Sequence, residues 1–133
     1  KPKDINDKKF ISYLKRLKPD LLICCHGRQI LKRDILAIGC INLHPCLSKY
    51  KGANPIARLL ADKNTKASVG AHWMEEKVDE GEVIREEFLE VQGKTPAEIY
   101  NQLYPIYSRV LIKLFSKSNS LLLKPRIRKI EAK

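Results

Sequence analysis

The chain has 133 residues, 44% apolar and 31% charged, proportions typical of one soluble globular domain with a single core. It shows no apolar run near the ~20 residues of a membrane span and no secretory signal pattern, which argues against membrane-spanning and secreted classes. Its four cysteines lie in or beside apolar segments, which favours buried thiols of a reducing compartment over a disulfide framework. We therefore expect a cytoplasmic protein without a membrane partner.

The net charge of +11 is concentrated at the two ends of the chain. Residues 1–19 hold seven Lys or Arg and two Asp, and residues 113–133 hold seven Lys or Arg and one Glu. Residues 20–112 hold twelve of each sign. A protein that binds nucleic acid usually carries its basic residues on the binding face. The neutral middle therefore favours solvated basic ends, with a polyanion or a phosphate-bearing substrate as the alternative.

The first predicted helix lies in a charged stretch near the start. Phe10, Leu14 and Leu17 recur at i, i+4 and i+7, the pattern of an amphipathic helix, which should end near Pro19. Residues 21–25 (LLICC) then form an unbroken apolar run. Such runs are typical of strands that are buried on both faces, as in a parallel sheet.

A parallel crossover should follow this strand. Residues 30–38 are predicted as a short helix that Gly39 closes, and residues 40–43 as the next strand. A strand, a short helix and a second strand make a parallel pair, which is right-handed by default.

The rest of the chain predicts two helices and two alternating strands. Asn54 is expected to cap a helix that begins at Pro55, and Thr95 to Glu98 read as a capping box before a long helix. The two strands should form an antiparallel pair joined by an acidic loop. The predicted ranges are 55–63 and 95–114 for the helices, 67–74 and 83–91 for the strands, and 121–123 for a short last strand.

These elements predict an α/β fold with a mixed sheet of two parallel strands and an antiparallel pair, flanked by helices. We expect residues 1–133 to form a single partial domain. Strands buried on both faces need neighbours in the sheet, and the first residues offer only a helix. We therefore expect that the first strands of the sheet are absent from this chain, or that a partner chain supplies them.

A candidate catalytic group lies where the strand of residues 40–43 ends. Asn42 and His44 are two residues apart, so a strand should direct both side chains to the same side. Ligands of open α/β sheets bind in the crevice beyond the carboxyl ends of the strands. Asp79, in the acidic loop, could orient His44 and hold its charge, while the amide of Asn42 could donate to a developing oxyanion. Each residue alone would be ordinary, and the combination predicts chemistry.

The sequence resembles the folate-dependent formyltransferases, which include glycinamide ribonucleotide, methionyl-tRNA and sugar N-formyltransferases. Three linked motifs carry the resemblance over roughly residues 10–115: Asn-x-His, a following glycine-containing loop, and Asp-x-Gly some 35 residues later. The matching segments are residues 41–45 (INLHP), 49–56 (KYKGANPI), 69–74 (VGAHWM) and 78–84 (VDEGEVI). The resemblance implies the C-terminal part of a Rossmann-like fold.

The resemblance also implies an activity and its cofactor. A primary amine would attack the formyl carbon of formyl-tetrahydrofolate, the formyl donor, and a tetrahedral oxyanion would form and collapse. Asn42 would donate to the oxyanion, a protonated His44 would assist proton transfer, and Asp79 would orient His44. No metal ion is expected. The residues that the resemblance assigns to the folate pocket are Arg28, Gln29, Ile30, Leu31, Glu75, Glu76 and Val78.

The chain departs from the family after the histidine. Residues 45–48 (PCLS) make a loop that is one residue shorter than the family's and lacks its second proline. The loop borders the predicted site, so folate geometry or substrate access should differ there. Gly81, in the acidic loop, is expected to serve a tight turn rather than to bind directly.

The sequence does not decide which amine accepts the formyl group. A nucleotide-linked amino sugar is slightly favoured over glycinamide ribonucleotide because of Tyr100, Tyr104 and Tyr107. Methionyl-tRNA formyltransferase is the alternative, so transfer RNA is the minority partner, and otherwise we expect a small-molecule amine and no nucleic acid. A non-catalytic fragment with a binding or structural role is a further alternative, and a homodimer is one assembly left open. A zinc or redox module is disfavoured because no Cys-x-x-Cys spacing exists.

Overall fold

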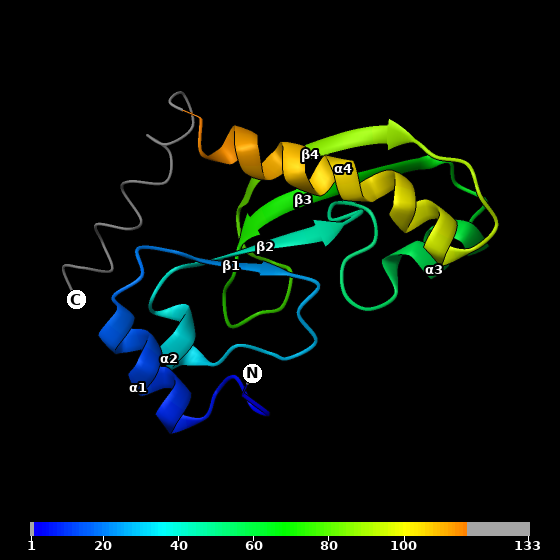
Figure 1. Ribbon diagram of the computed structural model, residues 1–133. Helices are drawn as coiled ribbons and strands as arrows, with labels where there is room; N and C mark the ends of the chain where they lie inside the picture. The colour runs from blue at the N-terminus through cyan, green and yellow to red at the C-terminus, as the bar shows by residue number, and fades with distance from the viewer. Residues whose placement is uncertain (1, 117–133) are drawn as a thin grey trace.

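The computed structural model describes residues 2–116, which form one four-stranded sheet with four helices (Figure 1). The strand order is β1-β2-β3-β4, with β1 parallel to β2 and both other pairs antiparallel. The predicted α/β class and mixed sheet are confirmed. The elements are α1 (Lys8–Leu17), β1 (Leu22–Cys25), α2 (Arg33–Leu36), β2 (Cys40–Pro45), α3 (Pro55–Ala61), β3 (Lys66–Trp73), β4 (Val83–Glu90) and α4 (Pro96–Leu114).

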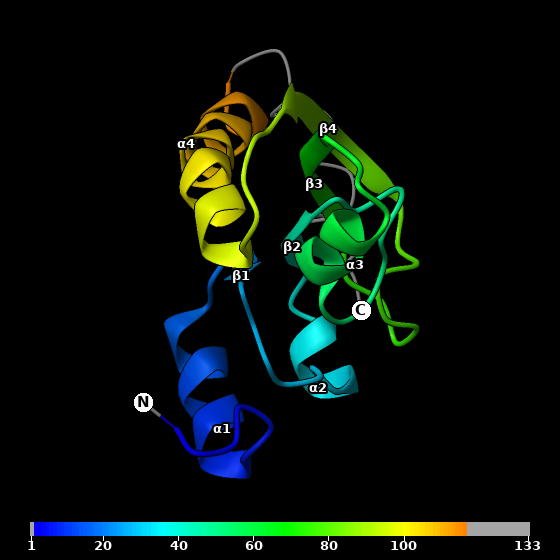
Figure 2. The same ribbon diagram turned by 90° about the vertical axis from the view of Figure 1, so that its right-hand side faces the viewer.

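The two faces of β2 contact different parts of the molecule. Ile41 and Leu43 are buried in the main core, which packs the sheet against α4 and α3. Cys40, on the opposite face, belongs to a smaller core with α1 and α2. Figure 2 shows α4 along one side of the sheet, with α1 and α2 grouped near β1 and β2. By strand alternation, Asn42 and His44 share the face of Cys40 and point away from the main core.

The prediction that residues 21–25 are buried on both faces is wrong for the described chain. β1 is an edge strand, because β2 is the only strand that pairs with it within residues 2–116. Ile23 is 42% exposed, and Cys25 is exposed as well. An edge strand leaves one row of backbone groups without a partner strand. That further strands complete the sheet stays a prediction.

The helix predicted at residues 30–38 is shorter than expected. Only Arg33–Leu36 are helical, and Gly39 ends the segment with a φ of 92°. The side chain of Asn6 donates to the carbonyl of Ile30 at 2.9 Å and accepts from the N–H of Lys32 at 2.8 Å. The N-terminal segment thus occupies backbone groups that a longer helix would need.

The cap of α3 differs from the prediction, whereas that of α4 agrees with it. Asn54 precedes Pro55 as expected, but it is left-handed (φ 52°) and its side chain makes no capping bond. Thr95 and Glu98 form the predicted reciprocal capping box. The strand predicted at residues 121–123 lies outside the described residues. Among residues 2–116, no helix combines the length and apolar character needed to cross a bilayer.

Glu87 contacts three cations, and two of them, Arg109 and Lys113, link β4 to α4. Its carboxylate lies 2.6 Å from Arg109, 2.7 Å from Lys113 and 2.9 Å from Arg85. Burial opposes its ionisation, but hydrogen bonds from Lys113, Arg109 and Arg85 outweigh that cost and lower the pKa of Glu87 to about 2. The ionised form therefore stabilises the fold.

Glu87→Gln should lower the free energy of unfolding by about 1–2 kcal/mol at pH 7, because the ion pairs are lost. A carboxyl group whose pKa is lower in the folded chain than in the unfolded chain stabilises the fold at pH values above its unfolded pKa. This stabilisation is lost as the pH falls toward 2. Urea unfolding should therefore show a smaller gap between wild type and variant at pH 3 than at pH 7. The exposed Glu90 of the same strand provides a control, Glu90→Gln, which should change little. A gap independent of pH would contradict the assignment.

Candidate active site

The antiparallel pairing of β2 and β3 brings three polar side chains to one face of the sheet. Asn42 lies opposite His72, and His44 lies opposite Gly70. Asp79 comes from the loop between β3 and β4 and has a φ of 55°. A Cβ atom on Gly81 would lie 1.7 Å from the carbonyl oxygen of Trp73. Glycine is therefore required where this loop folds back against the end of β3, because a side chain would collide with the backbone there.

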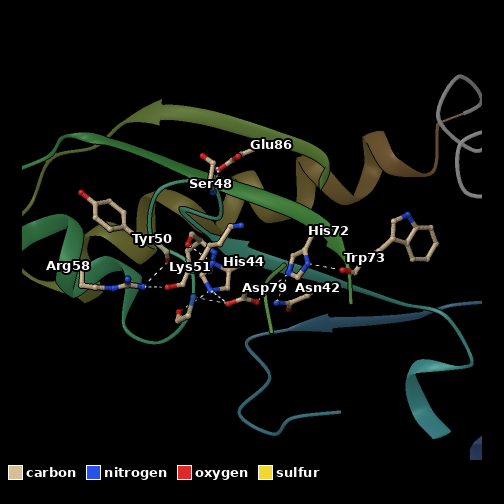
Figure 3. Close-up of polar contacts among 12 residues, drawn as sticks. Asn42, His44, Ser48, Tyr50, Lys51, Arg58, His72, Trp73, Asp79 and Glu86 are labelled. Carbon is tan, nitrogen blue, oxygen red and sulfur yellow. Dashed lines mark hydrogen bonds and ion pairs between the residues drawn. The ribbon is translucent and has the colours of Figure 1, made fainter. Parts of the chain in front are cut away.

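The carboxylate of Asp79 is the centre of the cluster (Figure 3). Oδ2 lies 3.2 Å from His44 Nε2 and accepts the Gly52 N–H at 2.8 Å. Oδ1 lies 3.4 Å from His72 Nε2. The side chain of Asp79 is only 8% exposed, so the contacts of Oδ2 with His44 and Gly52 replace water that a buried carboxylate has lost. The structure thus brings the predicted Asn42, His44 and Asp79 into one site.

His44 contacts oxygen acceptors through both ring nitrogens. Nδ1 lies 2.8 Å from the carbonyl of Pro45, and Nε2 lies 3.1 Å from the carbonyl of Gly52 as well as beside Asp79. Each nitrogen can donate to these oxygens only when it carries a proton. A doubly protonated ring, as the proposed chemistry requires, could therefore donate to these oxygens from both nitrogens.

His72 is the site residue that the sequence reasoning missed. It is 1% exposed, and its Nδ1 donates to the carbonyl of Trp73 at 2.9 Å. Burial lowers the pKa of His72, and this outweighs the opposite effects of the Trp73 hydrogen bond and of Asp79. In the neutral ring, Nε2 can accept from the amide Nδ2 of Asn42, 3.4 Å away. The only signal in the sequence was a lone polar residue in the segment VGAHWM.

The shortened loop after His44 is tied to β3. Leu47 is fully buried, and a Cβ atom on Gly70 would lie 2.6 Å from the Cβ of Leu47. The N–H of Cys46 also donates to the carbonyl of Ser68 at 2.9 Å. Close packing on a glycine therefore holds this loop against β3.

The cluster opens into a pocket of about 420 Å³. The pocket is bounded by the cluster, by the loop after β1 and by the acidic loop. Of the residues predicted to bind a cofactor, those lining it are Arg28, Gln29, Ile30, Leu31, Glu75 and Val78. Glu76 belongs to the same acidic loop but is not among the lining residues. Ile30 is 68% exposed and Val78 54% exposed, so apolar surface is available at the rim for a ligand to cover.

The cysteines do not form a metal site within residues 2–116. All four are free thiols, and this part of the chain contains no group of three His, Cys, Asp or Glu residues arranged to hold a metal ion. Burial raises the pKa of Cys40 to about 12, which makes its thiolate form unfavourable at neutral pH.

Comparison with known proteins identifies relatives of this site and fold. Residues 1–114 match the family model described as formyl transferase. The bifunctional polymyxin resistance protein ArnA of Wigglesworthia glossinidia brevipalpis is 34% identical over 135 residues, which are 98% of this chain and 20% of that protein. Methionyl-tRNA formyltransferase of Methylacidiphilum infernorum is 34% identical over 116 residues, or 84% of this chain and 36% of that protein.

A solved structure has the same fold. Phosphoribosylglycinamide formyltransferase of Campylobacter jejuni superposes with a TM-score of 0.68 at 24% identity, covering 81% of this chain and 61% of that one. The chain thus spans only part of the length of the proteins it matches. The family match, which covers most of the chain, shows that this chain belongs to the formyl transferase family.

Proposed function

We propose that this chain transfers a formyl group from formyl-tetrahydrofolate to a primary amine. The observation that carries the proposal is the arrangement of Asn42, His44 and Asp79 at one end of an open pocket. Two hydrogen-bond donors and a carboxylate that orients one of them are what acyl transfer to nitrogen requires.

The pocket has features that suit the ring system of a folate. Apolar side chains line it from three segments, as expected for a site that holds a flat heterocycle. They are Ile30, Leu31, Leu36, Met74 and Val78. We infer that the ring of the donor lies between the loop after β1 and the acidic loop. Its formyl carbon would then lie next to Asn42 and His44.

Asn42 is proposed to bind the oxyanion of the tetrahedral intermediate. One N–H of its amide can donate to the neutral His72, which leaves the second for the pocket. His72 thereby acts as a hydrogen-bond acceptor that orients the amide of Asn42. It needs no contact with the substrate for this role. A donor held in place before reaction avoids reorganisation in the transition state, which is the main source of oxyanion stabilisation.

His44 is proposed to stabilise the same oxyanion and to assist proton transfer. As the amine attacks, a new C–N bond forms and the nitrogen acquires a positive charge. Collapse of the intermediate breaks the C–N bond to tetrahydrofolate, and one proton passes from the attacking nitrogen to the leaving nitrogen. Asp79 holds the imidazolium in position for this transfer, which is the ordinary role of a carboxylate beside a catalytic histidine.

The amine acceptor is proposed to be a small molecule, either a nucleotide-linked amino sugar or glycinamide ribonucleotide. Tyr100, Tyr104 and Tyr107, which had favoured the sugar, contact His26 and do not line the pocket beside Asn42. They therefore give no support to either acceptor. The 34% identity to a methionyl-tRNA formyltransferase keeps transfer RNA as the second candidate. A cytoplasmic location and a homodimer stay predictions.

The direct test incubates the purified chain with formyl-tetrahydrofolate and a panel of amines. The panel should contain an amino-sugar nucleotide, glycinamide ribonucleotide and methionyl-tRNA. Release of tetrahydrofolate that depends on one amine would support the proposal and identify the acceptor. Binding of tetrahydrofolate without transfer to any of these amines would favour the non-catalytic alternative.

Asn42→Ala and Asp79→Ala should each lower the turnover number by about 100- to 1,000-fold, the usual cost of losing an oxyanion donor or its support. Circular dichroism should show the fold intact for Asn42→Ala, because Asn42 lies outside the main core. Lys77→Ala, an exposed change in the same loop, serves as the control. Near-normal turnover in either variant would refute the assigned roles.

The lowered pKa of His72 predicts a pH effect on stability. Because burial depresses the folded pKa below its ordinary value of 6.5, the unfolded chain binds this proton first as the pH falls. Stability should therefore decline below pH 6.5. His72→Gln should lose less stability than wild type between pH 7.5 and 5.5 in urea unfolding. Nitrogen-15 spectra should show a neutral ring protonated at Nδ1 in the folded chain at pH 6.5. An imidazolium there would overturn the assignment.

A further inference from the structure

Gly52 contacts both Asp79 and His44 through its backbone. Its N–H donates to Asp79 Oδ2 at 2.8 Å, and its carbonyl accepts from His44 Nε2 at 3.1 Å. A shift of this one residue would therefore move the carboxylate and the imidazole together. The position of Gly52 is thus a requirement of the proposed chemistry.

The packing around Gly52 does not fix its position. Nothing lies within 4 Å of the place where its Cβ atom would be, and its φ of 82° is left-handed. The preceding turn is anchored, because Tyr50 N–H donates to Cys46 at 2.8 Å and the Tyr50 hydroxyl donates to Asp62 at 2.8 Å. Both hydrogen bonds are made by Tyr50, so neither of them holds the next peptide, which joins Lys51 to Gly52.

Arg58, on α3, holds that peptide from the side opposite to Asp79. Its Nη2 donates to the carbonyl of Tyr50 at 2.9 Å and also to the carbonyl of Lys51 (Figure 3). The carbonyl of Lys51 and the N–H of Gly52 belong to one trans peptide unit, so they point in opposite directions. The guanidinium thus binds one end of the unit while Asp79 binds the other.

The two contacts should strengthen one another. A cation at the carbonyl oxygen polarises the peptide and makes its N–H a stronger donor, since linked hydrogen bonds reinforce each other. The neighbouring ion pair of Lys51 with Glu80 (3.2 Å) is a weaker anchor, because both side chains are more than 40% exposed. Arg58 itself is exposed on α3, so its removal should not open the core.

We propose that Arg58 is a positioning residue for formyl transfer: it orients the Lys51–Gly52 peptide, which in turn holds Asp79 and His44. This inference rests on the proposed function. Arg58 does not line the pocket and is not assigned any contact with substrate. A substitution of Arg58 should therefore lower the turnover number and leave substrate binding nearly unchanged.

The test compares Arg58→Met, which keeps the aliphatic stem, with Arg16→Met, which removes an exposed arginine from α1. Arg58→Met should lower kcat by about 10- to 30-fold with KM within about twofold, as expected for a misplaced catalytic group. Its thermal midpoint should fall no further than that of the Arg16 control. Low millimolar guanidinium chloride should restore part of the lost kcat in Arg58→Met and have no effect on Arg16→Met.

A second measurement separates this inference from the proposed function. The amide proton of Gly52 should move upfield and exchange faster in Arg58→Met, whether or not the chain transfers a formyl group. If wild type transfers to none of the amines tested, the proposed function fails while this amide still reports the positioning by Arg58. An unchanged Gly52 resonance, a kcat within twofold of wild type, or a change confined to KM would each overturn the inference.

Discussion

The site depends on one buried negative charge. Asp79 is almost removed from water, and an ionised carboxylate in such a place is tolerated only when charges and donors surround it. The partners of Oδ2 come from separate parts of the chain: His44 from β2 and the N–H of Gly52 from the loop before α3. The same contacts that make the carboxylate tolerable also fix the catalytic geometry.

The two histidines beside Asp79 have different surroundings. His72 is enclosed in the sheet, its Nδ1–H donates to the carbonyl of Trp73 and burial lowers its pKa, so its Nε2 can accept from Asn42. Both nitrogens of His44 face oxygen atoms, and this ring borders the pocket. Environments that separate two similar groups in this way are how enzymes assign different roles to them. In the proposed mechanism one imidazole orients an amide while the other provides charge.

Local geometry was enough to predict Asn42 and His44, whereas Asp79 was predicted from the chemistry that a histidine needs and from the resemblance. Strand alternation placed Asn42 and His44 on one side, and the capping box at Thr95 marked the start of α4. His72 was missed because its role arises from the pairing of β2 with β3, a contact between residues 30 positions apart. The extent of α2 was overestimated for a similar reason, because Asn6 binds the backbone near Ile30.

The division of β2 into two faces explains how this small sheet can hold a polar site. Ile41 and Leu43 complete the main core on one face, while the alternate positions are free to carry an amide and an imidazole. Stability and chemistry are thus assigned to different residues of the same strand. Gly70 and Gly81 are needed for both stability and the site. A Cβ atom on Gly70 would collide with the loop that completes the site, and a Cβ atom on Gly81 would collide with the end of β3. A substitution at these glycines would displace the loops that bring Gly52 and Asp79 to His44, even though neither glycine contacts the substrate in the proposed mechanism.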